Sequence, residues 1–402
     1  MAKSIQTLCD TYNISQYGFL PEKCTRVLPV NFKFLKDIVN HLEENKLNNF
    51  RKLFDLLPDY HTRTHSITSL TLGEKQYMYS ILCMIVHRYV WCSGVSDAKL
   101  YATIPAIIGI PFYEVSNDLG IPPVLTHAAV DLYNWHLIDE TREFSLDNIN
   151  TNHTMTGDPS ECWFYKVMIA IEGVGGNILK RLLKYDQTNY QKILVDINNL
   201  LKQCTKLIKR MYEGCDPDFF FNNIRIYLAG SNNENLPNGI TIASDPPIVL
   251  KYTGGSAAQS TLIQVFDVLF DVKHEGKFLE TMREYMPASH RNYLLNILPI
   301  KNYITPNDKK IYNQCISQLG KFRQAHLGLV YKYIAKFIAP DTIGKNVNAH
   351  GSKGAGGTEP VIFCQQVINE THNSKIKKDV SYHYYISTFL VILMFCVWRY
   401  YI

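Results

Sequence analysis

His326 is the side chain whose type and position best suit a metal-containing cofactor. Residues 309–338 show the apolar spacing of a helix, and His326 falls inside the apolar stripe, four residues after Phe322. A buried imidazole must find a hydrogen-bond partner or a metal. Geometrically His326 suits an axial haem ligand, with Arg323 one turn back and able to reach a propionate. A core histidine satisfied by a neighbouring group is the commoner explanation of such a pattern taken alone.

Arg225 could recognise a carboxylate. It lies in the segment DPDFFFNNIRIYLAG, in which Phe220, Phe221 and Arg225 fall within one and a half helical turns. A guanidinium held among aromatic rings can bind a carboxylate through two parallel hydrogen bonds, beside an apolar wall that accepts another ring. The alternative, again commoner without context, is an amphipathic helix whose arginine extends its charged end to solvent.

Two glycine-containing segments could complete a binding site. GGSAAQS at 254–260 permits close approach of the backbone and leads into a helix, whose free N–H groups can bind an anion. Residues 344–359 contain five glycines and almost nothing to bury, which predicts a mobile loop acting either as a lid or as a plain connector. The sequence contains no P-loop, Rossmann fingerprint, GxSxG elbow, HExxH or kinase signature.

The elements that must position these residues are mostly helices. Residues 1–137 alternate helical patterns with Pro- and Gly-marked turns and predict a small, mainly helical N-terminal domain. Residues 138–161 are rich in Asn, Thr, Asp and Ser, as an exposed linker would be. In residues 162–374 apolar side chains recur at three- and four-residue intervals, which predicts a large all-α domain whose helices wall the pocket.

Composition narrows the class of protein. The 402 residues include 41 Lys and Arg against 36 Asp and Glu, a formal charge of +5, and 46% are hydrophobic. Nucleic acid is therefore not an expected partner, and global disorder and fibrous classes are excluded. The first twenty residues lack the continuous apolar stretch of a secretory signal, so we expect the main domains to face the cytosol.

The C-terminal segment predicts a membrane anchor over residues 382–400. Residues 384–398 carry no charge, and the 17 residues of 382–398 would span roughly 25 Å as a helix, slightly less than the ~30 Å hydrocarbon core. Tyr and Trp stand at both ends, and Lys375, Lys377 and Lys378 precede the segment. This arrangement predicts a cytosolic body tail-anchored to the endoplasmic reticulum or the mitochondrial outer membrane. A buried C-terminal helix is the alternative.

Two ordered segments resemble the paired signature of the indoleamine 2,3-dioxygenase family. They are GGSAAQSTLIQVFDVLF at 254–270 and FLETMREYMPASHRNYLLNI at 278–297. The resemblance extends backwards through FFFNNIRIYLAG and forwards through RQAHLGLVYKYI and KGAGGTEP. It covers roughly residues 120–365, and the N-terminal part only loosely. A combination of this length and order is specific.

The resemblance implies a haem enzyme that opens the indole ring of L-tryptophan, or a related indoleamine, with O₂ to give N-formylkynurenine in the kynurenine pathway. The cofactor implied is haem b in the ferrous form, and a monomer is expected. The proximal iron ligand of the family falls on His326, and no side chain is expected to act as an acid or base. Positions that contact haem fall on Arg323, Asp267 and Gly255. Positions that contact substrate fall on Arg225, Phe220, Phe164, Ser256, Ala257 and Thr358.

Two positions depart from the family pattern on the distal side of the haem. Met168 stands where the best-known members have a small serine, and His127 stands where they have a tyrosine. Such changes reshape the pocket, so a haem protein that binds oxygen with little or no dioxygenase activity is the second hypothesis. Arg225 and Thr358 favour substrate binding.

Overall fold

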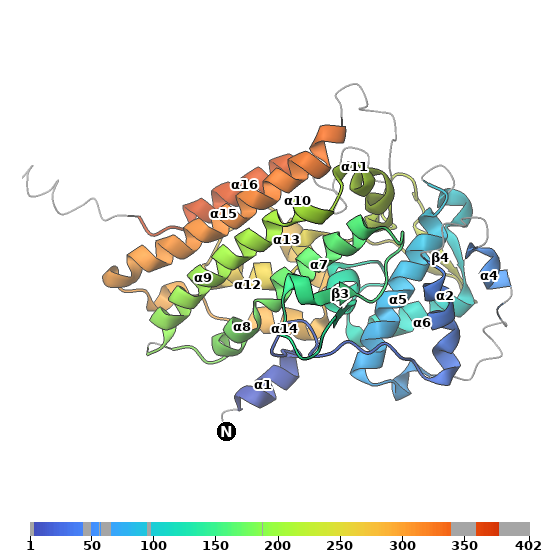
Figure 1. Ribbon diagram of the computed structural model, residues 1–402, viewed down its shortest axis with the longest axis horizontal. Helices are drawn as coiled ribbons and strands as arrows, with labels where there is room; N and C mark the ends of the chain where they lie inside the picture. The colour runs from blue at the N-terminus through green and yellow to red at the C-terminus, as the bar shows by residue number, and fades with distance from the viewer. Residues whose placement is uncertain are drawn as a thin grey trace, which may run out of the picture.

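The computed structural model describes residues 4–42, 50–55, 57, 66–94, 98–186, 188–338 and 359–377. This part of the chain is mostly helical, as the apolar periodicity predicts (Figure 1). The α-helices are α1 (Ile5–Tyr12), α2 (Lys33–Asn40), α4 (Lys52–Asp55), α5 (Leu72–Trp91), α6 (Ala106–Leu119), α7 (Pro159–Gly173), α8 (Gly176–Leu182), α9 (Tyr190–Lys209), α10 (Met211–Gly214), α11 (Pro217–Phe219), α12 (Thr261–Leu269), α13 (Phe278–Met282), α14 (Ala288–Asn296), α15 (Lys309–Tyr333) and α16 (Pro360–Asn373). The strands are β1 (Thr103–Pro105), β2 (Trp135–Leu137), β3 (Ile149–Thr151), β4 (Ile240–Ala243) and β5 (Ile248–Leu250).

Three long helices run side by side in one half of the molecule. Figure 1 shows α15 between α9 and α16, and α15 makes extensive contacts with both. The starts of α9 and α15 are joined by Asp308, which accepts hydrogen bonds from the Tyr190 hydroxyl at 2.6 Å and from the Gln191 amide at 2.7 Å. This packing holds the residue range 309–333, and with it His326, against two neighbouring helices.

Helix α5 lies in the other half of the molecule and is buried over most of its circumference. Its N-terminus carries a capping box, in which the Thr71 and Glu74 side chains each bind the other residue's backbone N–H. A helix that is apolar on all sides must be covered on all sides. Accordingly α5 packs against α2, α6 and the irregular helical turns near the pocket.

Short strands, which the sequence pattern did not predict, connect distant parts of the chain. Strand β1 pairs in parallel with β4, with Ile104 opposite Ile242, and β4 pairs antiparallel with β5. Strands β2 and β3 form an antiparallel pair in which Leu137 lies opposite Ile149. Runs of only three or four residues are too short to show a clear alternation in sequence.

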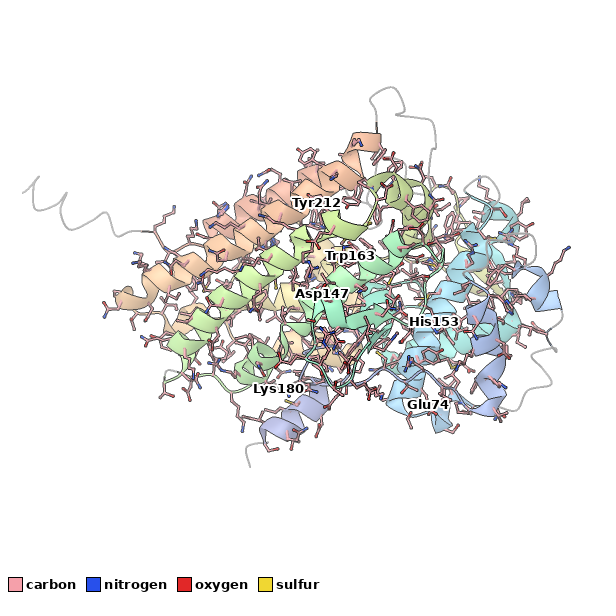
Figure 2. All side chains as sticks on the ribbon, viewed as in Figure 1. Glu74, Asp147, His153, Trp163, Lys180 and Tyr212 are labelled. Atoms are coloured by element: carbon pink, nitrogen blue, oxygen red, sulfur yellow. The ribbon has the colours of Figure 1, made fainter. Side chains whose placement is uncertain are left out.

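The stretch 138–161, expected to be an exposed linker, is partly packed. Leu146, Ile149 and Met155 are buried within it. Arg210 donates hydrogen bonds to both carboxylate oxygens of Asp147, and the Trp163 indole N–H donates to the Arg210 carbonyl at 2.8 Å. Figure 2 labels Asp147 and Trp163 beside this connection. The buried apolar cluster includes residues from both sides of this stretch, while the domain boundaries themselves stay a prediction.

Several predicted features fall outside the described residues. They are Thr358, residues 344–358 of the glycine-rich segment and the C-terminal segment 382–400. No helix among the residues that the structure describes has both the length and the apolar character needed to cross a membrane.

Candidate functional site

Two adjoining cavities bring most of the predicted site residues together. The larger has a volume of about 210 Å³ and the smaller about 100 Å³, and both are lined by Met168, Ala257 and His326. A single ordered water needs only about 10–15 Å³, so this space can accept a much larger group. The predicted residues that line the larger cavity are His326, Arg225, Phe220, Phe164, Gly255, Ser256 and Ala257. Asp267 and Arg323 line the smaller one.

His326 lines both cavities, and within the described residues only one of its ring nitrogens has a hydrogen-bonding contact. Its Nδ1 lies 3.8 Å from Cys364 Sγ on α16, the one hydrogen-bonding contact of the His326 side chain within the described ranges. His326 is partly buried. Burial, and then the charge of Arg323, lower the pKa of His326 to about 4. The ring is therefore neutral at physiological pH, which is the form that binds a metal.

Arg323 joins three helices beside His326. Its terminal nitrogens donate to both Asp267 carboxylate oxygens on α12, at 2.6 and 2.7 Å, and to the Thr371 hydroxyl on α16. Burial alone would raise the pKa of Asp267, but Arg323 and His274 outweigh it and lower the pKa. The pair thus fixes the helix that carries His326, while the predicted contact of Arg323 with a haem propionate stays a prediction.

Arg225 enters the larger cavity from a helical turn, η8 (Arg225–Leu228), that follows the π-helical turn η7 (Phe220–Ile224). The residue is only 2% exposed, and its Cζ lies 5.2 Å from the centre of the Phe221 ring. Burial lowers the pKa of Arg225 to about 10, so the guanidinium is still charged at neutral pH. A buried cation that lines a cavity is well placed to bind an anionic group.

An aromatic wall stands next to Arg225. The ring centres of Phe164 and Phe220 are 4.9 Å apart, and Phe220 meets Tyr333 edge-on at 5.6 Å. Phe164, Met168 and Glu172 follow one another at four-residue intervals on α7, so they share one face of that helix. The first two residues line the larger cavity and the last two line the smaller one.

The glycine-rich loop at 254–260 approaches neighbouring backbone closely. A Cβ on Gly254 would lie 2.0 Å from the Leu228 carbonyl oxygen, so only glycine fits there. The Gln259 amide donates to the Gly254 carbonyl at 2.8 Å and accepts from the His127 backbone N–H at 3.0 Å. The close approach that this segment predicts is therefore present, and it places Gly255, Ser256 and Ala257 on the cavity wall.

A buried ionic cluster, which sequence reasoning missed, forms another wall of the site. His127 Nδ1 lies 2.7 Å from Asp131, and its Nε2 lies 2.9 Å from Glu172, whose other contact is the Ser260 hydroxyl at 2.5 Å. Burial by itself would lower the pKa of His127, but the two carboxylates raise it to about 10. The four-residue spacing in HAAVD is a local signal for the His127–Asp131 pair, whereas Glu172 is 45 residues away.

These residues fit a haem. The neutral His326 ring offers Nε2 as an iron ligand, and the lining of the larger cavity is predominantly apolar, as a porphyrin requires. Met168 and His127, the two positions that depart from the expected family pattern, both line the larger cavity. The arrangement brings the His326 imidazole, the buried Arg225 guanidinium and an aromatic wall together in a single space.

Comparisons with known proteins agree with this arrangement. A family model described as indoleamine 2,3-dioxygenase matches residues 8–374. Indoleamine 2,3-dioxygenase 2 of Homo sapiens is 29% identical over 394 residues, covering 91% of this chain and 95% of the relative. Indoleamine 2,3-dioxygenase 2 of Mus musculus is 31% identical over 389 residues, covering 90% and 93%. The 6-hydroxytryptophan 2,3-dioxygenase of Fusarium equiseti is 28% identical over 340 residues, covering 76% and 82%. The chain therefore belongs to the indoleamine 2,3-dioxygenase family of oxidoreductases.

Proposed function

We propose that the protein is a haem-dependent dioxygenase that adds both atoms of O₂ across the C2–C3 bond of the L-tryptophan indole ring, giving N-formylkynurenine. The observation that carries this proposal is that one cavity is lined by both the His326 imidazole and the Arg225 guanidinium. The first suits the iron of a haem, and the second suits the carboxylate of an amino acid.

In this proposal His326 holds haem b through Nε2, in its ferrous form. When bound, the haem supplies the activation of O₂ that an oxygen-inserting reaction needs, since no protein side chain can provide it. Asp267 and Arg323 keep α15 in place beside the cofactor through their mutual hydrogen bonds. Neither side chain has to gain or lose a proton in this role.

Arg225 binds and orients the substrate carboxylate. With the carboxylate fixed at one end, Phe164 and Phe220 hold the indole ring by stacking and limit the positions that its C2–C3 edge can take. The cavity between these groups is mostly apolar, so a bound indole displaces water from it. The chain therefore contributes by positioning the substrate and by excluding water from the cavity, and we assign no side chain to proton transfer.

Ring-substituted tryptophans belong to the proposed substrate range. The relative from Fusarium equiseti is named for the dioxygenation of 6-hydroxytryptophan. Met168 and His127 line the cavity in which the ring would lie, so they are the positions expected to set the preference among indoles.

The second hypothesis, an oxygen-binding haem protein with little catalysis, receives less support from the geometry. A protein that only carries oxygen commonly stabilises it with a hydrogen-bond donor on the distal side. Both ring nitrogens of His127 are occupied by Asp131 and Glu172, so this histidine has no free donor to offer. A buried Arg225 on the cavity wall has a use in substrate binding and none in oxygen storage.

The test combines a spectrum with a product assay. Purified protein reconstituted with haem should show a Soret band, and with L-tryptophan, O₂ and a reductant it should form N-formylkynurenine, detected by its absorbance and mass. A protein that binds haem and O₂ but forms no product from tryptophan or its ring-substituted forms would favour the second hypothesis.

We also propose, from the sequence alone, that residues 382–400 anchor the protein to the endoplasmic reticulum or the mitochondrial outer membrane. The support is the uncharged run 384–398 with the preceding lysines. Fractionation of cells expressing the full chain tests the proposal.

A further inference from the structure

The carbonyl end of the turn η8, which begins with Arg225, is held from outside the turn. A 3-10 turn of four residues leaves its last carbonyl groups without partners inside the turn. Here the Leu228 carbonyl accepts from the Gly255 backbone N–H at 3.1 Å, and the Tyr227 carbonyl lies 2.8 Å from Nδ1 of His87. His87 is 1% exposed and belongs to α5. The position of η8 therefore depends on a loop and on one side chain of a distant helix.

The two ring nitrogens of His87 have opposite roles. The Leu125 backbone N–H donates to Nε2 at 2.9 Å, so Nε2 carries no proton. The proton of the neutral ring is then on Nδ1, which donates it to the Tyr227 carbonyl. Burial favours this neutral form, because it lowers the pKa of His87 to about 4. One side chain thus joins η8 to Leu125, and both Arg225 and Leu125 line the larger cavity.

Helix α5 also holds the backbone around Val124, next to Leu125. Tyr79, Cys83 and His87 follow one another at four-residue intervals and share one face of α5. The Tyr79 hydroxyl donates to the Val124 carbonyl at 2.9 Å, and the Cys83 thiol donates to the same carbonyl at 3.3 Å. Among the hydrogen bonds of these three side chains in the described part of the chain, only one of those made by His87 reaches η8.

We propose that His87 is a positioning residue, which sets the place of Arg225 relative to the cavity wall at Leu125 and thereby controls recognition of the substrate carboxylate. His87 lines neither of the two cavities, so it acts through the backbone of η8. A misplacement of about 1 Å in a group that orients a substrate can cost about a hundred-fold in rate. This inference rests on the proposed function, because it assumes that Arg225 binds the carboxylate.

Two substitutions separate the two hydrogen bonds of His87. The amide of asparagine takes the place of Nδ1, so His87→Asn can still donate to the Tyr227 carbonyl but does not reach Leu125. The amide of glutamine takes the place of Nε2, so His87→Gln can still accept from the Leu125 N–H but leaves the Tyr227 carbonyl without its donor. Equilibrium binding of L-tryptophan and of tryptamine to each haem-loaded protein is followed by the Soret shift without oxygen.

The two variants should differ in their response to the carboxylate. We expect His87→Gln to weaken the binding of L-tryptophan roughly ten-fold and that of tryptamine, which has no carboxylate, by less than about two-fold. His87→Asn should bind both ligands within about three-fold of the wild-type affinity. Cys83→Ala is the matched control, since it removes a hydrogen bond between the same face of α5 and Val124 but leaves the contact with η8 in place. In that variant the ratio of the two dissociation constants should stay at its wild-type value.

A double-mutant cycle with Arg225→Ala tests whether His87 acts through Arg225. Once the guanidinium is gone, His87→Gln should change L-tryptophan binding by less than about two-fold, because the group that His87 positions is absent. A ten-fold effect that persists in the Arg225→Ala background would overturn the inference. Equal losses for L-tryptophan and tryptamine in His87→Gln would also overturn it, and so would equal losses in His87→Asn and His87→Gln.

The remaining outcomes separate this inference from the proposed function. If His87→Gln does not fold, His87→Asn decides, since a selective loss of L-tryptophan binding there contradicts the inference and retained binding supports it. If neither variant retains haem, the inference is wrong, because His87 then maintains the fold. An Arg225→Ala variant that binds L-tryptophan as the wild-type protein does, or a wild-type protein that forms no N-formylkynurenine, would refute the proposed function. Normal dependence on Arg225 without any effect of His87→Gln would refute only this inference.

Discussion

Replacing Arg225 by alanine should separate substrate recognition from haem binding. The guanidinium lines the larger cavity, and its Cζ lies near Phe221, whereas the proposed iron ligand is on a different helix. We expect Arg225→Ala to keep its full haem content and lose most of its activity on L-tryptophan. The activity of Arg225→Lys on L-tryptophan should lie between those of Arg225→Ala and the wild-type protein, because lysine keeps the charge but cannot form two parallel hydrogen bonds.

The size of the effect follows from the burial of Arg225. Burial disfavours the cation and lowers the pKa of Arg225 to about 10, so the guanidinium is still charged at neutral pH. A carboxylate that binds there makes charge-assisted hydrogen bonds with the guanidinium, worth about 1.5 to 3 kcal/mol. The expected loss in kcat/KM is therefore roughly ten- to a hundred-fold.

The assay compares L-tryptophan with tryptamine, which has the same ring and no carboxylate. If Arg225 binds the carboxylate, Arg225→Ala should lower kcat/KM for tryptophan and leave the value for tryptamine nearly unchanged. Arg210→Ala is the control, since Arg210 pairs with Asp147 and Glu213 outside the cavities. An equal loss for both substrates, or no loss for tryptophan, would refute the assignment of the carboxylate to Arg225.

Four further predictions concern the cofactor, the buried ion pairs and the C-terminus. His326→Ala should abolish haem retention, and an unchanged Soret band per mole of protein would exclude His326 as the ligand. His127→Gln should lower the free energy of unfolding by about 3 to 5 kcal/mol, because two buried carboxylates lose their shared cation. The carboxylates raise the pKa of His127 to about 10 despite its burial. The stabilisation by His127 should therefore be complete below about pH 6.5 and disappear as the pH rises through 10, and urea titrations at several pH values measure it. Asp267→Asn should lower the free energy of unfolding by about 3 to 5 kcal/mol at neutral pH, whereas the exposed Asp147→Asn should lower it by less than about 1 kcal/mol. Since the pKa of Asp267 is lowered, the Asp267–Arg323 pair of the wild-type protein should stabilise the fold above pH 3.8 and lose this contribution in stronger acid. Deleting residues 380–402 should release the protein from membranes with its haem content intact, and a truncated chain that cannot retain haem would contradict the anchor hypothesis.

The helices and the position of the proposed metal ligand could be read from local patterns. The spacing of apolar residues predicted a helix over 309–338, and the structure has α15 over Lys309–Tyr333 followed by a short turn to Phe337. Helix formation depends on neighbours three and four residues away, so these signals lie within a short window of sequence. The same holds for the stripe that contains His326 and for the glycines at 254 and 255.

Pairing between distant segments could not be read in this way. The strands β1 and β4 pair across more than 130 residues, and each has only three or four residues. Their partners are selected by packing of the whole chain, because each strand alone is too short and too weakly patterned to specify one.

The same distinction holds for the site, where some residues could be identified from the sequence and most of their contacts could not. His326, Arg225 and Phe220 could be named from the sequence because their types and their resemblance to a known signature pointed to haem and a carboxylate. Other contacts exist only because α7, α12, α15 and α16 meet around one space. They are the hydrogen bonds of Arg323 with Asp267 and Thr371, and the position of His127 between Asp131 and Glu172. Burial and contacts between segments far apart in the chain set these hydrogen bonds and the associated pKa values. The sequence therefore determined which helices form and which side chains they carry, and the tertiary structure alone decided which charges meet, because electrostatic pairing acts through distances in space that local sequence does not encode.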